Sequence, residues 1–541
     1  MIAGALLAGV AVSCTSAGES FEPIPRTVVI RDRMGENDSI LFYFPASESS
    51  FEERIARAAE RASVPNRGIE ERDTTVEGAR LFALETTLGT KRSFLSRRLD
   101  GSQLAPFDVF GNGSLVVRLH PWATPVSPEV LPITSDPFSA EFSIRTGQTV
   151  GYRLPPSHLV EVLGFLLGIV LFPYVVLRWA AGRIRRSSAE DVDKVHRLRV
   201  ATAVVAILVP IALIAGAVAL ALLWVPDVVL AGLAPSLTRD AALESILGLI
   251  VFVGVYLLAM VPAYRAIGPL YRQLRGIEAS PVSRATRIRL AVGLGVPFLI
   301  WVVAINVVNL QGNALVGAIS DVVLLVLLLA LTPVVLIRAL PTRSIAGPLR
   351  SRLDALLAER GVRVRDIRVW QTRSQKVGNA LVLGAVPRFR YVILTDYLLD
   401  NLAEKELEAI VAHEMGHAKQ HHVLLKLLGL VAVIAVVAGG SIALSVAFEG
   451  LSEALVAIAL PLAFIVGALL VQGWLGLVLE RKADDYGAEL IGVEPMVGAL
   501  ERLGAMNMMK PRTGLLWDVL NQHPGLEQRI ERLRRATERS A

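Results

Sequence analysis

Two histidines and a glutamate in one short segment have the residue types and spacing of a metal-dependent hydrolase. His413, Glu414 and His417 form an HExxH pattern. On an α-helix the two histidines lie one turn apart on one face, so both imidazoles can bind a single Zn²⁺, and the glutamate can take a proton from water at the metal. Three fixed residues also occur by chance, so the surrounding chain has to support a metallopeptidase.

The residues around this pattern predict the helix that carries it. The segment 401–404, Asn-Leu-Ala-Glu, offers an N-cap followed by an acidic first turn. The two histidines share one face, and the other face is apolar through Leu407, Ile410, Val411 and Met415. The alternative, two surface histidines on an amphipathic helix, is disfavoured by the glutamate between them.

A third metal ligand is expected from a later helix. In a metzincin the pattern would continue with glycine and histidine, but Gln420 and Val423 stand at those positions. Glu480 is the candidate, because it directly follows the last apolar segment. Asp484, one turn further on, is spaced to accept the ring N–H of a liganding histidine. The alternative is that these charges only anchor the apolar segment at the membrane interface.

The composition predicts a multi-pass membrane protein that is mainly α-helical. Of 541 residues, 53% are hydrophobic, and the mean hydropathy is +0.53. Seven apolar segments have about the length that a helix needs to cross a bilayer. They are 162–177, 200–225, 246–264, 290–310, 322–337, 427–448 and 454–479.

The net charge of +6 is interpreted as a signal of membrane orientation, with no nucleic-acid partner expected. Basic residues fill the connections between apolar segments one and two and between three and four, whereas 226–245, 311–321 and 449–453 contain only Arg239. The positive-inside rule then predicts an extracytoplasmic N-terminal domain and an HExxH segment at the cytoplasmic face of the cell membrane.

The remaining chain divides into predicted domains. Residues 1–20 resemble a signal or anchor without basic residues at its start, and Cys14, the single cysteine, excludes intrachain disulfides. A free thiol at Cys14 is favoured over lipidation. Residues 21–157 predict an extracytoplasmic α+β or β-rich domain, 158–340 a transmembrane region of five spans, and 341–541 a metallopeptidase domain that includes the last two spans.

Short patterns predict the elements of the two folded domains. In the N-terminal domain, β-prone runs occupy 27–30, 40–44, 80–84, 114–119 and 138–144, and Ser50 opens a helix over 51–62 with a capping-box pattern. In the C-terminal domain, 362–371 alternates like a strand, and 379–383 with 390–394 predict a β-hairpin. Such a strand edge can pair with an extended substrate, although an ordinary hairpin explains the pattern equally well.

Three motifs in order resemble the M48 zinc metallopeptidases, the group of the CAAX prenyl endopeptidase Ste24 and the bacterial protease HtpX. They are HEMGHAKQHH from His413, ERKADDYGAE from Glu480, and HPGLEQRI from His523. The resemblance covers roughly residues 340–541, and it implies a zincin-type fold of helices plus a small β-hairpin or sheet. Seven spans with an outer N-terminus are more similar to Ste24 than to HtpX.

The resemblance also implies roles for individual residues. His413, His417 and Glu480 would bind one Zn²⁺, Glu414 would be the general base, and Asp484 would orient a ligand. His523 would bind substrate or stabilise the oxyanion. Substrate contacts would come from Asn379, Ala380 and Arg529. The chain departs from the family pattern beside His523, at Asn521-Gln522 and Gly525, and His421 and His422 are expected on a solvated helix face.

The predicted function is that of an integral-membrane zinc metalloendopeptidase acting on peptides or membrane proteins at the cytoplasmic face. Two alternatives remain open. The outer domain would sense a ligand and the peptidase would cleave a regulator, or the chain would be a non-catalytic membrane scaffold. The intact HExxH pattern together with Glu480 argues against the scaffold.

Overall fold

The structure is a computed structural model, which describes residues 24–32, 38–66, 68–72, 74, 76–88, 91–93, 96–119, 123–126, 131–135, 140–222, 241–277, 289, 300, 304, 314–447 and 453–540. The predicted leader with Cys14 lies outside these residues, as does nearly all of the predicted span 290–310. The chain forms two compact units, one of Met1–Gly168 and Ala215–Leu249, the other of Ile169–Ile214 and Ile250–Ala541.

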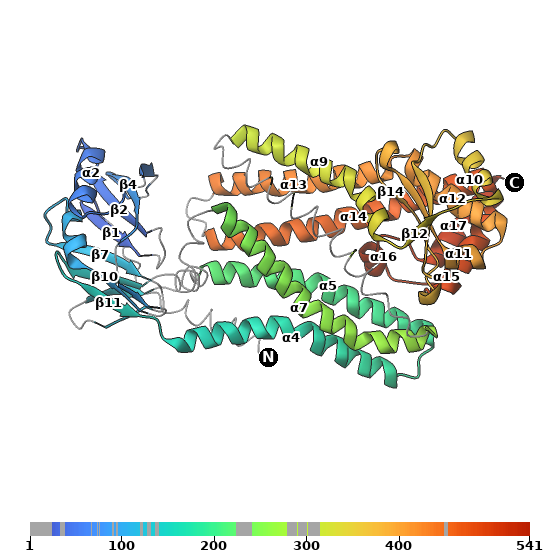
Figure 1. Cartoon of the computed structure of the whole chain (residues 1–541), viewed down its shortest axis with the longest axis horizontal. Coiled ribbons are helices and arrows are strands. Elements are labelled where there is room, and N and C mark those ends of the chain that lie inside the picture. Colours follow the sequence, from blue (N-terminus) through green and yellow to red (C-terminus); the bar gives the residue numbers. More distant parts are fainter. Residues whose placement is uncertain are drawn as a thin grey trace. The chain divides into compact units, whose positions relative to one another are not determined.

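The first unit is rich in β-structure (Figure 1). A seven-stranded sheet has the order β3-β4-β2-β1-β7-β10-β9, and a four-stranded sheet has the order β5-β6-β11-β8. The strands are β1 (Thr27–Arg31), β2 (Asp38–Pro45), β3 (Ile69–Arg72), β4 (Ala79–Thr86), β5 (Lys91–Ser93), β6 (Ser96–Leu99), β7 (Ser114–Leu119), β8 (Thr124–Pro125), β9 (Leu131–Ser135), β10 (Ala140–Arg145) and β11 (Val150–Arg153). All five predicted runs are confirmed as strands, and the described part of the unit contains six further strands that were not predicted.

Helix α2 (Phe51–Arg61) covers the main core of this unit. Alternate residues of β2 point to opposite sides of the sheet, so Phe42 joins the core beneath α2 whereas Leu41 joins a smaller cluster on the other face. The predicted helix is confirmed, but the prediction of a capping box at its start is wrong. Ser50 has a left-handed backbone with φ 65°, and its side chain caps no helix amide.

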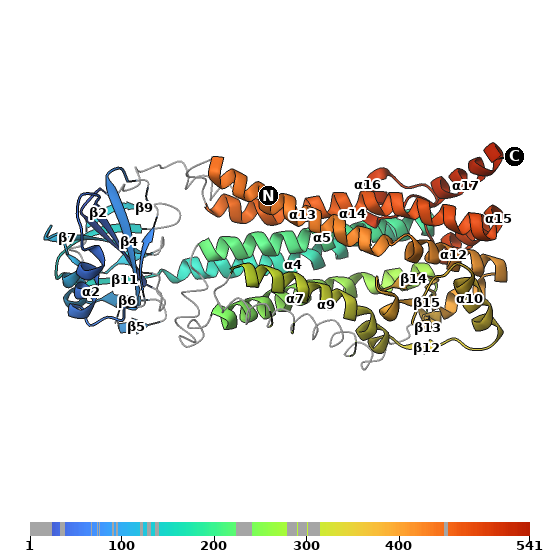
Figure 2. The same cartoon turned by 90° about the horizontal axis from the view of Figure 1, so that it is seen from above.

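Long apolar helices dominate the second unit (Figure 2). They are α4 (Pro156–Arg186), α5 (Asp191–Leu222), α7 (Ala241–Arg275), α9 (Ala314–Ala339), α13 (His422–Ala447) and α14 (Glu453–Ile491). The start of α4, the end of α5 and the start of α7 belong to the first unit. Within the described residues, five stretches are long and apolar enough to cross a membrane, namely Leu163–Arg186, Asp191–Ala217, Ile250–Arg275, His422–Gly440 and Ala459–Ile491. The predicted span 322–337 lies in α9, where the described apolar stretch, Val326–Ala339, is shorter.

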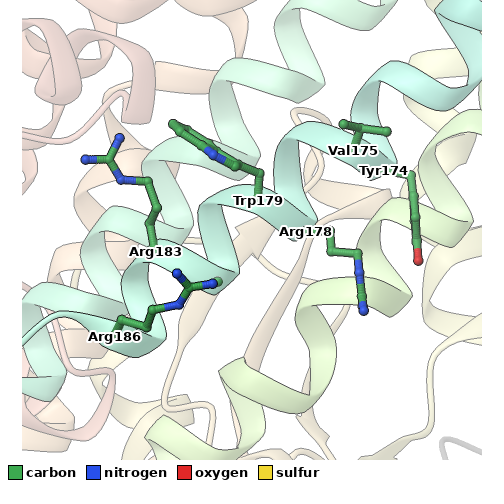
Figure 3. A pocket seen from close by; sticks show the side chains of 7 residues that line it. Tyr174, Val175, Arg178, Trp179, Arg183 and Arg186 are labelled. Carbon is green, nitrogen blue, oxygen red and sulfur yellow. The ribbon is translucent and has the colours of Figure 1, made fainter.

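The basic end of α4 has the composition of a membrane interface. Tyr174, Arg178, Trp179, Arg183 and Arg186 line a cavity of about 450 Å³ along this one helix (Figure 3). The Trp179 side chain is 62% exposed, and the Arg183 guanidinium lies 5.0 Å from the centre of its ring. Aromatic and basic side chains gather in this way where membrane helices meet water.

The C-terminal part contains a four-stranded sheet of order β12-β13-β15-β14 and shorter helices. The strands are β12 (Thr342–Ser344), β13 (Asp366–Trp370), β14 (Ala380–Leu383) and β15 (Tyr391–Thr395). The helices are α10 (Pro348–Glu359), α11 (Asp396–Asn401), α12 (Glu404–Lys419), α15 (Val493–Met506), α16 (Leu515–Asn521) and α17 (Leu526–Ser540). The predicted hairpin is confirmed, because β14 pairs antiparallel with β15.

Helix α12 carries the HExxH pattern, as predicted, but its N-cap differs. Asn401 ends α11, and Ala403 is the N-cap of α12. Ala403 has no side chain that can cap a helix amide. The Glu406 carboxylate compensates in part, because it accepts a hydrogen bond of 2.9 Å from the Ala403 amide.

Arginines at the ends of α5 and α7 hold the C-terminal part in place. Arg199 donates to the carbonyls of Asn507, at 2.6 Å, and Met508, at 3.3 Å, just beyond α15. Arg275 donates to the carbonyls of Met506, at 3.0 Å, and Lys376, at 2.5 Å. These bonds satisfy carbonyls at a helix end that otherwise have no partner within the helix.

Candidate metal centre and active site

Helices α12 and α14 bring three potential metal ligands together. The Nε2 atoms of His413 and His417 lie 3.1 Å apart. The Glu480 carboxylate on α14 lies 3.3 Å from Nε2 of His417 and 3.6 Å from Nε2 of His413. One donor atom from each residue fits within 4.8 Å of the others. The structure therefore brings together the three residues that the sequence predicted as ligands.

Gly416 allows the two helices to approach this closely. A Cβ atom at this position would lie 3.2 Å from the Ala483 Cα and 3.2 Å from the Tyr486 Cβ. Both distances are shorter than ordinary van der Waals contact, so a larger residue would push α14 away from α12. The glycine in HExGH thus sets the distance from the histidines to Glu480.

Asp484 and Arg529 fix the orientation of His413. The Asp484 carboxylate lies 3.0 Å from Nδ1 of His413, which turns Nε2 toward Glu480. Arg529 on α17 donates to both carboxylate oxygens of Asp484, at 2.9 and 2.5 Å. Arg529 is buried behind the ligands. This differs from the substrate-contacting position that the family resemblance implied.

His422 orients His417 in the way that Asp484 orients His413. The sequence alone did not predict this role. Its Nδ1 lies 2.8 Å from Nδ1 of His417, and its Nε2 lies 3.1 Å from the Gln420 side-chain oxygen. His422 is 2% exposed, so the prediction of a solvated helix face is wrong for this residue. The reason is a break in the helix: His421 has φ 55°, and α13 begins at His422 in a new direction.

Glu414 is held beside the open edge of the sheet. Its carboxylate accepts a hydrogen bond of 2.9 Å from the amide of Val382 in β14. Burial raises the pKa of Glu414 above its ordinary value, and the neighbouring histidines only partly offset this. A carboxylate with a raised pKa is a stronger proton acceptor, which suits a general base.

Strand β14 presents backbone groups to the same space. It is the edge strand of its sheet, and the Val382 amide points away from β15 toward Glu414. Because strand residues alternate, the Ala380 amide points to the same open side. Asn379 is exposed, and its backbone bonds to Thr395 through the carbonyl at 3.0 Å and through the amide at 2.9 Å.

His523 faces Glu480 from the loop after α16. Its Nδ1 lies 3.0 Å from the Glu480 carboxylate, and its side chain is 48% exposed. Gly476 of α14 permits this approach, because a Cβ atom there would lie 2.5 Å from the Gln522 carbonyl oxygen. Lys426 donates to the Gln522 side chain at 3.0 Å, which ties the loop to α13. Gln522, one of the two unusual residues before His523, therefore has a packing role.

The site carries a surplus of negative charge. Three carboxylates, on Glu414, Glu480 and Asp484, face one buried guanidinium, on Arg529, which leaves a formal charge of −2 when the histidines are neutral. Burial opposes charge on His413, but the hydrogen bond to Asp484 and the negative charge of Glu480 raise the pKa of His413 above its ordinary value. The surroundings of the ligand atoms thus favour a cation.

The donor set suits zinc. Two imidazole nitrogens and one carboxylate oxygen form a ligand set of catalytic zinc sites, in which the fourth position stays open for water. The helix pair with HExxH on one member and a glutamate on the other, beside an edge strand, defines a zincin-type metallopeptidase domain joined to membrane helices.

Comparisons with known proteins identify the family. The profile of peptidase family M48 matches residues 346–537. Protease HtpX of Haemophilus ducreyi is 31% identical over an alignment of 198 residues, and the match covers 32% of this chain and 67% of the relative. Protease HtpX of Actinobacillus pleuropneumoniae is 33% identical over an alignment of 178 residues, and the match covers 29% of this chain and 62% of the relative. The chain thus spans under two thirds of the length of the latter relative. The chain belongs to peptidase family M48.

Similarity extends to solved structures. The crystal structure of S. mikatae Ste24p aligns with 70% of this chain and 99% of its own, at 15% identity and a TM-score of 0.47. This distant likeness adds nothing to the family assignment.

Proposed function

We propose that the protein is a zinc-dependent endopeptidase of the membrane that cleaves peptide bonds of membrane proteins or membrane-associated proteins at the cytoplasmic face. The observation that carries the proposal is the meeting of His413, His417 and Glu480 around one point, with Glu414 beside it. The family relationship supports the same conclusion.

The chain's own groups account for positioning and proton transfer. An extended substrate pairs with the open edge of β14, where the Ala380 amide is available. Zinc, when bound by His413, His417 and Glu480, supplies Lewis-acid activation of water and of the scissile carbonyl. Glu414 accepts the proton of the attacking water and passes it to the leaving amine.

His523 serves the developing oxyanion. Its Nδ1 faces the Glu480 carboxylate, and when both ring nitrogens carry a proton, Nε2 on the half-exposed side of the ring donates a hydrogen bond to the oxyanion. Arg529 acts as a positioning residue through Asp484 and His413, because its guanidinium is buried behind the ligands. We therefore assign the substrate contacts to β14 and His523.

The cytoplasmic placement rests on where the basic helix ends lie. Arg183, Arg185 and Arg186 end α4, and Arg275 at the end of α7 bonds to the peptidase part. Arginine-rich helix ends face the cytoplasm in most membrane proteins. In a chain with Cys14 replaced by serine, a cysteine at position 187, between α4 and α5, should be shielded from an impermeant thiol reagent in intact cells. Labelling there would invert the orientation.

The catalytic assignment is tested with Glu414→Gln. The purified full-length variant should retain zinc, but its cleavage of a quenched-fluorescent unfolded protein should fall by roughly 10²–10⁴-fold. Glu404→Gln is the matched control, since Glu404 lies on the same helix and is 74% exposed. Cleavage by Glu414→Gln at the wild-type rate would show that Glu414 is not the base.

A further inference from the structure

A basic cavity lies where the end of α9 meets the four-stranded sheet. Its volume is about 550 Å³, and its walls come from α9 and the segment after it, from β13 and from β15. Four arginines line it, namely Arg289, Arg338, Arg365 and Arg368. They come from three separate parts of the chain.

The cavity has a large surplus of positive charge. Asp366 is the single carboxylate in its lining, so four guanidinium groups leave a formal charge of +3. Asp366 is already engaged, because it accepts hydrogen bonds from Arg350, at 2.6 Å, from Ser344, at 3.0 Å, and from Arg368, at 3.4 Å. Among the described residues, neither Arg338 nor Arg365 pairs with a carboxylate. The Arg365 guanidinium instead lies 5.9 Å from the centre of the Tyr391 ring.

An apolar track along α9 leads to these arginines. Leu327, Leu331, Val334 and Arg338 follow one another at spacings of four, three and four residues, which places them on one face of the helix. Leu327 and Leu331 are 51% and 48% exposed, and Val334 lines the cavity itself. Ile337 packs against Tyr391 and Ile393 of the sheet, which fixes the junction. The site is thus apolar at one end and cationic at the other.

The arrangement differs from the interface belt on α4. There, the arginines and Trp179 belong to a single helix and cover its own surface (Figure 3). General attraction to a membrane surface explains such a belt. At the end of α9, arginines from separate segments of the chain converge on one open cavity beside exposed leucines, which is the layout of a site for one amphipathic anion.

We propose that this cavity binds the phosphate headgroup of an anionic phospholipid, whose acyl chains lie along Leu327, Leu331 and Val334 of α9. The headgroup phosphate lies among Arg338, Arg365 and Arg368. Because β13 pairs with β15, and β15 with the edge strand β14, the lipid fixes the sheet to the membrane helix on which it rests. This inference does not depend on the proposed peptidase activity.

Native mass spectrometry of the full-length protein tests the proposal. The purified protein in a neutral detergent is mixed with equal amounts of phosphatidylglycerol and phosphatidylcholine, and the lipid that remains bound is counted. One phosphatidylglycerol per chain is expected in preference. In Arg338→Gln/Arg365→Gln its retention should fall about 10- to 30-fold, since each arginine near an anionic surface contributes about fivefold. Arg365→Gln alone should reduce it about fivefold, which keeps the test decisive if the double variant folds poorly.

Arg343→Gln/Arg363→Gln is the matched control. It removes the same charge from exposed positions outside the cavity, Arg343 in β12 of the same sheet and Arg363 just before β13. If the control variant retains phosphatidylglycerol like the wild type, the result supports the site. If the control and cavity variants lose it equally, general attraction to basic surface residues explains the binding. Undiminished retention in the cavity variants would overturn the proposal. If inorganic phosphate bound as tightly as phosphatidylglycerol, the ligand of the cavity would be a soluble anion and not a lipid.

Discussion

The two units of the chain each bury a cluster of charged side chains, and the clusters are completed in different ways. In the β-rich unit, Arg97 pairs with Asp38 at 2.8 Å and with Asp32. The Tyr152 hydroxyl donates to Asp32 at 2.7 Å, and the Leu88 amide donates to Asp38 at 3.0 Å. These carboxylates therefore have their partners within the protein.

The two clusters differ in how their charge is balanced. In the β-rich unit, two carboxylates and one arginine leave a formal charge of −1. One proton can balance this charge, because burial and the charge of Asp32 raise the pKa of Asp38 to about 7. The ligand cluster leaves −2, and three of its donor atoms converge on one point. Among the described residues this is the group arranged to hold a metal ion. The comparison shows that the direction of the donor atoms, more than burial or charge, separates a metal site from a structural ion cluster.

The largest expected effect comes from removing the arginine of each cluster. Arg97→Met and Arg529→Met each leave a buried carboxylate without its partner, so each should destabilise its own unit by about 3–5 kcal/mol. Hydrogen exchange of the full chain reports the two units separately. Only Arg529→Met should also lose zinc. Zinc loss in Arg97→Met, or full zinc content in Arg529→Met, would contradict the distinction.

A smaller effect is expected from Gly476→Ala. Its Cβ atom would meet the Gln522 backbone at 2.5 Å, and overpacking of this kind costs about 1–3 kcal/mol. The shift should move His523 away from Glu480 and lower the cleavage rate by about 100-fold without loss of zinc. The control is Gly439→Ala in α13, where a Cβ atom has nothing within 4 Å. Equal activity of the two variants would show that His523 is not positioned by this contact.

The β-rich unit should also respond to pH. Asp38 has a pKa of about 7 in the folded state against an ordinary value of 3.8, so its contribution is complete only below about pH 4 and is lost as the pH rises from there through 7. Between pH 5.5 and pH 8 the free energy of unfolding of this unit should fall by about 2 kcal/mol. Hydrogen exchange of β2 and β6 measures it. In Asp38→Asn this fall in the free energy of unfolding should disappear. If the fall persisted, another titratable group would be responsible for it.

The smallest expected effect concerns His422. His422→Leu removes the group that orients His417, which should weaken zinc binding on the order of tenfold while the fold is kept. Competition with a zinc chelator measures this affinity. His421→Asn, at the exposed neighbouring position, should bind zinc like the wild type. Equal affinity in both variants would mean that His422 is merely a packed core residue.

The sequence predicts the ligands because their positions follow from periodicity and topology. An i, i+4 spacing places His413 and His417 on one face, and Glu480 is the carboxylate that directly follows the last apolar segment. His422 was missed because the sequence does not show that the helix breaks at His421. Continued helically, its side chain would point well away from His417.

Some strands of the β-rich unit could not be predicted from the sequence for a similar reason. Strands β2 and β7 have long apolar runs and were predicted, whereas β6 is short and basic, with Arg97 buried by partners from distant strands. Such a strand exists because its neighbours pair with it and neutralise its charge. The edge position of β14, and its contact with Glu414, likewise depend on the order of strands in the finished sheet.

The most direct test of the account is the zinc content of purified full-length chains. Wild type and Glu414→Gln should each contain about one zinc per chain, with two nitrogen ligands at about 2.0–2.1 Å by X-ray absorption. Glu480→Ala should lose most of the zinc, whereas Glu489→Ala, at an exposed position of the same helix, should keep it. If Glu480→Ala still holds one zinc in the same coordination, then α12 and α14 do not share a metal ion and the central claim is wrong.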